Sequence, residues 1–281
     1  MNVMLKFLSA LAVAAAIAVG TAGANGSPYS PGLQYGWPGV GQRDDDIRFV
    51  AFGMPKSTIV AAVRARDGRV VRSRVVRGFY GVPLVAYDGT AGGLSGNGRS
   101  FVLGSYGPLP GDAGKTRLVV LDTKTLATRR RIVLRGSWSF DAISPDAATL
   151  YLTQHLRAGE NPLYRVRPLD VRTGQLQGAI VDRLEGEDEM GGVPVARVSS
   201  ADGRWAYTLY ARRGDSPFVH ALDTLKREAF CIDLPLEFGY DKQWSLRLKL
   251  DASRRLLSAW LPGSRVATVD VRTWKAAAVR G

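Results

Sequence analysis

The side chains that could do chemistry in this sequence are few, and metal binding is the first chemistry to consider. There are two histidines, His155 and His220, each with a carboxylate a few residues away. No spacing typical of a metal site joins them, so we expect structural or solvated histidines. The acidic runs at 43–46 and 185–190 lack the glycine-spaced loop that holds calcium. The sequence therefore predicts no cofactor, with a divalent metal such as calcium as the alternative.

Catalytic motifs are missing from the sequence as well. It contains no G-x-S-x-G nucleophile elbow, no H-E-x-x-H pair and no phosphate-binding P-loop. The single cysteine, Cys231, lies between Phe230 and Ile232, and nothing near it in the sequence would make it reactive. One cysteine also excludes an intramolecular disulfide, so the fold must hold through packing. These observations favour a binding protein over an enzyme.

Asp141 and Arg197 are the two charged residues with the most informative positions. They fall at the same place in successive sequence repeats, near the start of a strand. Two interpretations stay open for them. They could face a central channel and contact a ligand, or they could form an ion pair between neighbouring repeats, which is the commoner structural outcome.

The chain repeats a pair of hairpins, and these must position the residues above. SPDAATLYLTQ (144–154) is rewritten as SADGRWAYTLYA (200–211), and related copies begin at Ser95 and Leu250, in steps of about 50 residues. A second hairpin follows each copy, for example VLDTKTLATRR after Val120. Matching aspartates mark the second hairpins: Asp122, Asp170, Asp223 and Asp270. A degenerate fifth copy begins at Thr58.

Each copy alternates apolar and polar residues with period two, which is typical of strands with one buried face. Its Ser, Asp, Gly and Pro residues suit tight turns. Four antiparallel strands per repeat predict an all-β fold, a β-propeller of about five four-stranded blades, with six as the alternative. A helical solenoid of similar period disagrees with the β-branched and aromatic pattern. We expect a closed ring, in which 33–40 or another segment supplies the inner strand of the first blade.

The quoted hairpins resemble the YVTN-type and TolB-type propeller repeats of bacterial proteins, which pair an SPDGxxLYV-like hairpin with a VxDxxTxxV-like hairpin. The resemblance covers roughly residues 95–280 and, more weakly, 43–94. The YVTN tetrapeptide and the Trp-Asp dipeptide of WD repeats are both missing. The resemblance therefore implies a fold and no particular activity.

The connections between the strands differ in length between the two faces of such a disc. Turns such as SPDAA are short, whereas connections such as 77–93 and 236–245 are long and rich in aromatic and charged residues. Binding residues usually lie on long loops of a rigid scaffold, so we expect a ligand on the loop-rich face. The candidate ligand-binding residues are Tyr80, Tyr87, Asp88, Trp138, Asp141, His155, Tyr164, Arg197, Tyr240 and Trp244. The alternative is that the aromatic residues pack the loops onto the blades.

The N-terminus predicts export. Lys6 precedes a long apolar stretch that ends in Ala22-Gly23-Ala24, which is typical of a signal peptide over residues 1–24. An uncleaved membrane anchor is the alternative. A lead-in segment at 25–42 and a propeller domain at 43–281 would follow. We therefore expect a secreted, periplasmic or cell-envelope protein with no membrane span after cleavage.

The formal net charge of +13 favours anionic partners or, alternatively, a basic surface that is simply solvated. The arginines are scattered, so we expect no nucleic-acid partner. Several of them fall on predicted outer strands, where charge discourages aggregation. The sequence predicts a monomeric, non-enzymatic binding or scaffold domain for a protein or an envelope polysaccharide. A propeller hydrolase or lactonase with a metal in the channel is one alternative, and a structural surface protein without a discrete ligand is another.

Overall fold

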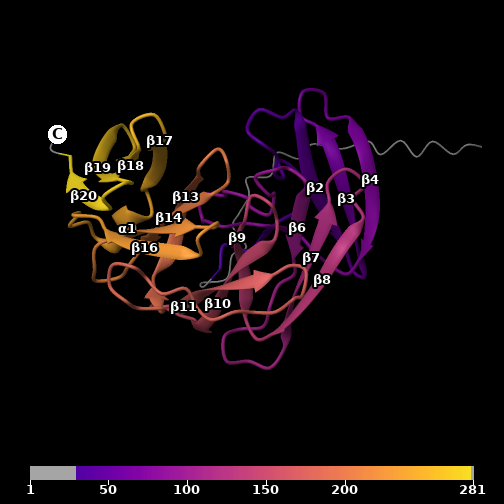
Figure 1. Cartoon of the computed structure of the whole chain (residues 1–281), viewed down its shortest axis with the longest axis horizontal. Helices are drawn as coiled ribbons and strands as arrows, with labels where there is room; N and C mark the ends of the chain where they lie inside the picture. Colours follow the sequence, from indigo (N-terminus) through magenta and orange to yellow (C-terminus); the bar gives the residue numbers. More distant parts are fainter. Residues whose placement is uncertain (1–29, 280–281) are drawn as a thin grey trace, which may run out of the picture.

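The computed structural model describes residues 30–279, which form an almost entirely β structure (Figure 1). The expected signal peptide and the first residues of the lead-in lie outside the described residues. One short helix, α1 (Tyr240–Gln243), interrupts the strands. Within residues 30–279, none of the helices has the length and apolar character needed to cross a membrane.

Five antiparallel sheets follow one another along the chain, and each is a simple meander. The first sheet contains β2 (Ile47–Met54), β3 (Ser57–Arg64) and β4 (Val70–Arg77). The second contains β6 (Ser100–Gly104), β7 (Lys115–Asp122) and β8 (Thr128–Arg135). The third contains β9 (Trp138–Ile143), β10 (Thr149–Arg157), β11 (Leu163–Asp170) and β12 (Met190–Gly191).

The last two sheets are also four-stranded. The fourth contains β13 (Val193–Ser199), β14 (Trp205–Ala211), β15 (Phe218–Asp223) and β16 (Glu228–Asp233). The fifth contains β17 (Arg247–Asp251), β18 (Leu256–Leu261), β19 (Ser264–Asp270) and β20 (Lys275–Ala278). A separate two-stranded pair joins β1 (Leu33–Gln34) to β5 (Val82–Pro83). The expectation of an all-β chain with several four-stranded antiparallel sheets is confirmed.

Short irregular segments supply the inner position of the two three-stranded sheets. The Gly36 N–H donates to the Ala51 carbonyl at 2.8 Å, and Val40 pairs with Phe49 at the inner edge of β2. Leu94 pairs with Phe101 in the same way at the edge of β6. Of the segment 33–40 that the sequence offered for the first inner strand, residues 36–40 lie there, whereas Leu33 and Gln34 pair with β5 instead.

The repeated Ser-x-Asp turns are held by the same short-range hydrogen bonds in each copy. The Ser144 hydroxyl donates to Asp146 Oδ1 at 2.6 Å, the Ala148 N–H donates to the same oxygen, and the Thr149 N–H donates to Ser144 Oγ. Ala147 takes the left-handed conformation that the turn needs, with φ 62°. The equivalent turns use Ser95 with Asn97 and Ser200 with Asp202. Side chains that bond their own turn explain why the sequence pattern recurs.

The matching aspartates of the second hairpins also hold turns. Asp122 accepts the Thr125 N–H at 2.8 Å. Partial burial opposes ionisation of Asp122, but the hydrogen bonds from Thr125 and Arg129 outweigh it and lower the pKa of this carboxyl to about 2. The corresponding bonds are Asp170 with Thr173, Asp223 with Leu225 and Asp270 with Arg272. These aspartates therefore serve the fold rather than a ligand.

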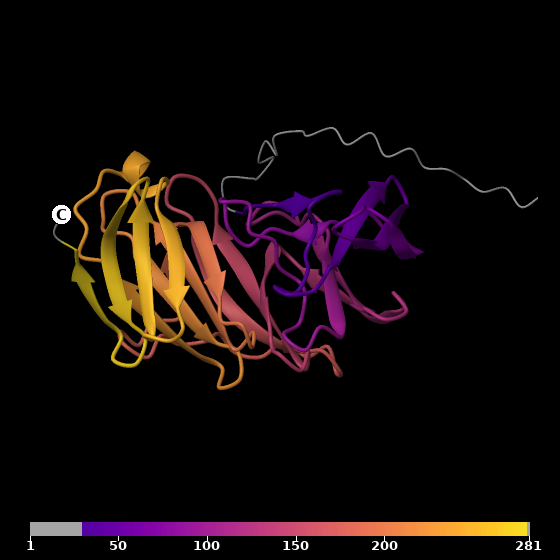
Figure 2. The same cartoon turned by 90° about the horizontal axis from the view of Figure 1, so that it is seen from above.

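Hydrophobic clusters join each sheet to the next one along the chain. Members from neighbouring sheets are Phe49 with Phe101, Val120 with Phe140, Tyr151 with Leu222, and Leu209 with Leu257. No such cluster among residues 30–279 joins the fifth sheet to the first. Figures 1 and 2 show these two sheets at opposite ends of an arc, so the sheets do not close into the ring expected from the repeats.

Candidate functional site: a central groove

The inner strands of the arc surround a groove of about 1040 Å³, which we call the central groove. Its lining comes from all five sheets or their inner segments, within 40–45, 90–96, 140–143, 197–203 and 248–252. Because inner strands from successive repeats meet here, residues far apart in sequence become neighbours. Polar side chains such as Gln42, Asp45 and Lys249 lie beside apolar ones such as Leu248.

Asp141 and Arg197 form a buried ion pair in the wall of this groove. Arg197 Nη1 donates to Asp141 Oδ1 at 2.7 Å, and Arg197 Nη2 donates to the Asp141 backbone carbonyl at 2.7 Å. Arg197 Nη1 also donates to the Thr208 hydroxyl at 2.5 Å. Both side chains are about 95 % buried. The pair links the inner strand of the third sheet, β9, to that of the fourth, β13, so the ion-pair interpretation is confirmed and both residues also line the groove.

The long connection 77–93 supplies part of the groove wall, at Val85 and residues 90–93. The Tyr87 N–H donates to the Pro194 carbonyl at 2.8 Å, and the Asp88 N–H donates to the Val195 carbonyl at 3.1 Å. Asp88 also accepts the Arg197 N–H at 3.3 Å and holds its own turn through Thr90. This connection therefore attaches the second sheet to the fourth and closes the inner edge of β13.

A polar interior lies behind the ion pair, around a cavity of about 20 Å³ that is large enough for one water molecule. Asp141, His155, Tyr164 and Tyr210 line it. Burial lowers the pKa of His155 to about 4. Burial also lowers the pKa of His220 to about 4, against the opposing effect of Asp141. Both imidazoles are therefore neutral near pH 7.

The tyrosines of this interior are also held in their neutral form. Burial raises the pKa of Tyr164 well above its usual value, and the neighbouring Tyr210 adds to that rise. The two rings stack, with centroids 5.3 Å apart. A neutral, closely packed interior of this kind stabilises the junction of the third and fourth sheets.

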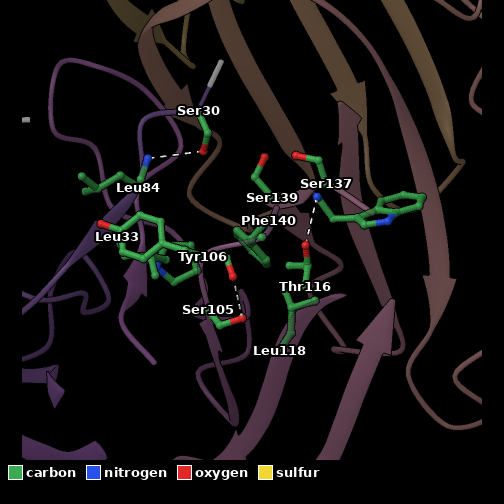
Figure 3. Close-up of a pocket in the computed structure, with 15 residues that line it drawn as sticks. Ser30, Leu33, Leu84, Ser105, Tyr106, Thr116, Leu118, Ser137, Ser139 and Phe140 are labelled. Atoms are coloured by element: carbon green, nitrogen blue, oxygen red, sulfur yellow. Dashed lines mark hydrogen bonds between the residues drawn. The ribbon is translucent and has the colours of Figure 1, made fainter. Parts of the chain in front are cut away.

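Sequence reasoning missed a serine–histidine contact in the same region. Ser139 Oγ lies 2.9 Å from His155 Nε2, which resembles the start of a nucleophile–base arrangement. An imidazole with a pKa near 4 is a weak general base at neutral pH. The adjoining cavity, lined by Ser139 and drawn in Figure 3, has a volume of about 40 Å³ and has no room for a substrate. The contact supports packing rather than catalysis.

The structure places the predicted ligand-binding residues in three different settings. Asp141 and Arg197 line the central groove, and Asp88 supports them from one side. Tyr80, Trp138, His155 and Tyr164 are buried, with at most 7 % of their surface exposed. Tyr87, Tyr240 and Trp244 pack on one another, with ring centroids 5.1 and 6.0 Å apart. Their role as ligand contacts stays a prediction, and burial favours packing for the second group.

Several groove residues were not singled out from the sequence, including Gln42, Asp45, Ser199 and Lys249. A signal existed for Ser199 and Lys249, because they lie on the inner strands β13 and β17, as Asp141 lies on β9. Gln42 and Asp45 lie in the turn that precedes β2. Among residues 30–279, no three His, Cys, Asp or Glu residues converge as a metal would need. The Arg197 guanidinium also occupies one Asp141 oxygen, which disfavours a cation at that carboxylate.

Comparisons with known proteins were made on both sequence and structure. No protein-family model and no curated protein sequence matches the chain. Similar solved structures include a putative TolB from Agrobacterium tumefaciens, at 14% identity and TM-score 0.43, covering 79% of this chain and 76% of that one.

TolB from Acinetobacter baumannii is similar at 14% identity and TM-score 0.39, covering 76% of this chain and 49% of that one, so the chain spans about half the length of that protein. The WD40 repeats of RRP9 are similar at 13% identity and TM-score 0.43, covering 85% of this chain and 66% of that one. These likenesses are to TolB-type and WD40 β-propellers at low identity. The fold assignment here depends on the strands and sheets described above.

Proposed function

We propose that the protein is an exported, non-enzymatic binding domain, built as a five-bladed open propeller, which recognises a protein or an envelope glycan in its central groove. The observation that carries this proposal is the groove itself, about 1040 Å³ in volume and lined from every sheet. A volume of this size suits an extended or branched polar ligand. The two small cavities near Ser139, in contrast, hold no more than water.

The lining favours recognition by hydrogen bonds and by charges of both signs. Asp44 and Asp45 stand on the first-sheet side, and Lys249 stands on the fifth-sheet side. Leu248 and Leu250 add apolar contact area between these charges. This choice of face differs from the loop-rich face that connection lengths alone suggested, because residues of the short turns, such as Asp44, Gly96 and Ala201, line the groove.

The alternative, a propeller hydrolase or lactonase with a metal in the channel, would use Asp141 as a ligand. The Arg197 guanidinium on the same carboxylate opposes that use, since two cations would then compete for one anion. We propose no resident cofactor. We also propose a monomer that is secreted or held in the periplasm or cell envelope.

A thermal-shift titration of the chain from Asn25 tests this proposal. The probes are soluble muropeptides, alginate as an acidic polysaccharide, and Ca²⁺ alone. We expect a saturable rise in Tm with a glycan, lost in Lys249→Glu and kept in Lys226→Glu, a matched reversal outside the groove. A Ca²⁺ shift that Asp141→Asn abolishes would favour the enzyme. A glycan shift that survives Lys249→Glu and disappears in Trp244→Ala would move the site to the loop-rich face.

A further inference from the structure

One end of the first sheet carries a group of exposed apolar side chains that the groove does not explain. Trp37, Phe52, Met54 and Phe79 are 54%, 48%, 38% and 43% exposed. We call these four residues the apolar patch. A single exposed aromatic residue is ordinary on a soluble protein, whereas a contiguous group marks an interaction surface.

The four residues are neighbours in space, although they come from three separate segments. A Cβ placed on Gly36, next to Trp37, would lie 3.4 Å from the Phe52 ring. A Cβ placed on Gly53, next to Met54, would lie 2.6 Å from the Phe79 ring. The Gly78 N–H donates to the Lys56 carbonyl at 2.9 Å, which brings the Phe79 segment against the β2–β3 turn. Because successive residues of a strand point to opposite faces, Phe79 lies on the Gly53 side of β2, whereas Phe52 and Met54 lie on the other side. The four residues therefore surround the β2–β3 end of the first sheet.

The position of the first sheet in the arc explains why Phe52 and Met54 lack cover. Phe49 and Val60, on one face of the sheet, pack in the cluster shared with the second sheet. The opposite face has no neighbouring sheet in the described part of the chain, and the first sheet forms one end of the molecule in Figure 1. Phe52 pairs across this face with Ile59, and Ile59 pairs with Val75, which is 64% exposed.

The other end of the arc is built differently. On β17 to β19, the residues that pack against the fourth sheet are apolar, such as Leu257 and Ala259. The alternate positions carry charges of both signs or hydroxyl groups, such as Lys249, Asp251 and Ser258, beside two partly buried apolar residues, Leu256 and Trp260. A face with mixed charges is suited to water. Exposed apolar side chains at only one end of the arc therefore indicate a surface that contacts a binding partner.

The charged residues in the chain segments that carry the apolar patch are all positive. Segments 31–42, 47–57 and 72–84 contain no Asp or Glu. They contain five basic residues: Arg48, Lys56, Arg72, Arg74 and Arg77. Lys56, Arg74 and Arg77 are exposed, and Arg77 pairs with Ser57 next to the β2–β3 turn. The chain as a whole carries a formal charge of +13.

We propose that the apolar patch docks on the surface of an anionic lipid bilayer. Tryptophan and phenylalanine side chains partition into the headgroup region, and Met54 adds apolar area beside them. Basic residues around them attract acidic headgroups, and each contributes roughly a fivefold gain in partitioning near an anionic surface. A second copy of this chain is disfavoured as the occupant, because two basic rims would then repel each other.

Co-sedimentation of the chain from Asn25 with lipid vesicles tests this inference. We expect binding to phosphatidylcholine vesicles that contain phosphatidylglycerol, and weak binding to phosphatidylcholine alone. Lys56→Glu with Arg77→Glu should lower the partition coefficient roughly 25-fold. Phe52→Ser with Phe79→Ser should lower it roughly tenfold or more. The matched controls, Lys226→Glu and Leu225→Ser, alter an exposed lysine and a leucine that is 54% exposed in the fourth sheet, and should bind as the parent does.

A second readout does not depend on the folding of the phenylalanine variants. Vesicles should shift the emission of Trp37 to shorter wavelength, measured as the difference between the parent chain and Trp37→Phe. Absence of binding to the anionic vesicles would overturn the inference. An equal loss in the control variants, or unchanged binding of the phenylalanine variants, would show charge attraction without a specific patch and would also overturn it.

Discussion

Mild acid should destabilise this protein, because its only two histidines are buried as neutral groups. Burial lowers the pKa of both His155 and His220 from 6.5 to about 4. Between those values the unfolded chain binds protons that the folded chain does not. The free energy of unfolding therefore falls as the pH drops from 6.5 toward 4 and is unaffected by these groups above 6.5.

The size of the effect follows from the same values. Each pKa lowering corresponds to roughly 3 kcal/mol, so the two histidines together should remove roughly 6 kcal/mol of stability by pH 4. That amount is comparable to the total stability of many domains. The measurement is urea unfolding followed by tryptophan fluorescence, at several pH values between about 7.5 and 4.5.

The variants His155→Gln and His220→Gln should each remove about half of this pH dependence. Glu185→Gln is a control that should change the pH dependence of stability in the opposite direction. Burial and neighbouring carboxylates raise the pKa of Glu185, so its removal should steepen the fall in stability on acidification. A free energy of unfolding that stays level from pH 6.5 to 4, or a double histidine variant with the parent's slope, would refute the reasoning.

Three further predictions concern single positions. Arg197→Leu should lower the free energy of unfolding by about 3–5 kcal/mol in the same urea assay, because it leaves the Asp141 carboxylate buried without its partner. Adding Asp141→Leu to this variant should recover much of that loss. Ala147→Gly should raise the stability by a few tenths to about 1 kcal/mol in thermal unfolding, because Ala147 has φ 62° and glycine tolerates that conformation better; a lower Tm would contradict the assignment of the turn. Gly96→Ala should lower the Tm, because its Cβ would lie 2.4 Å from the Asp202 carbonyl oxygen and push apart two turns that meet at the groove. Gly111→Ala is the control: its Cβ would have nothing within 4 Å, so this variant measures backbone strain alone.

Local features of the fold could be predicted because their causes are local. The Ser144 turn and the Asp122 turn are each held by side chains that bond within a few residues, so related sequence patterns recur along the chain. The same reasoning placed the segment ending at Val40 beside β2. Alternating apolar residues then defined the strands.

The rest of the structure depends on contacts that no short pattern encodes. The Asp88 N–H donates to the Val195 carbonyl across more than a hundred residues, and this contact holds the connection 77–93 against the inner strand β13. Repeats also predict ring closure, yet they cannot report whether the terminal sheets meet. The sequence suggested that Trp138 and Tyr164 lie in long connections, but they belong to β9 and β11, and packing between sheets buries both.

The central claim is that ligands bind in the groove between the inner strands. Hydrogen–deuterium exchange of the chain from Asn25, with and without a muropeptide or alginate that raises its Tm, tests this claim most directly. We expect slower exchange in 40–45, 90–96, 197–203 and 248–252, the segments that line the groove. Protection confined to the long connections at 155–165 and 236–245, with the groove segments unchanged, would contradict it.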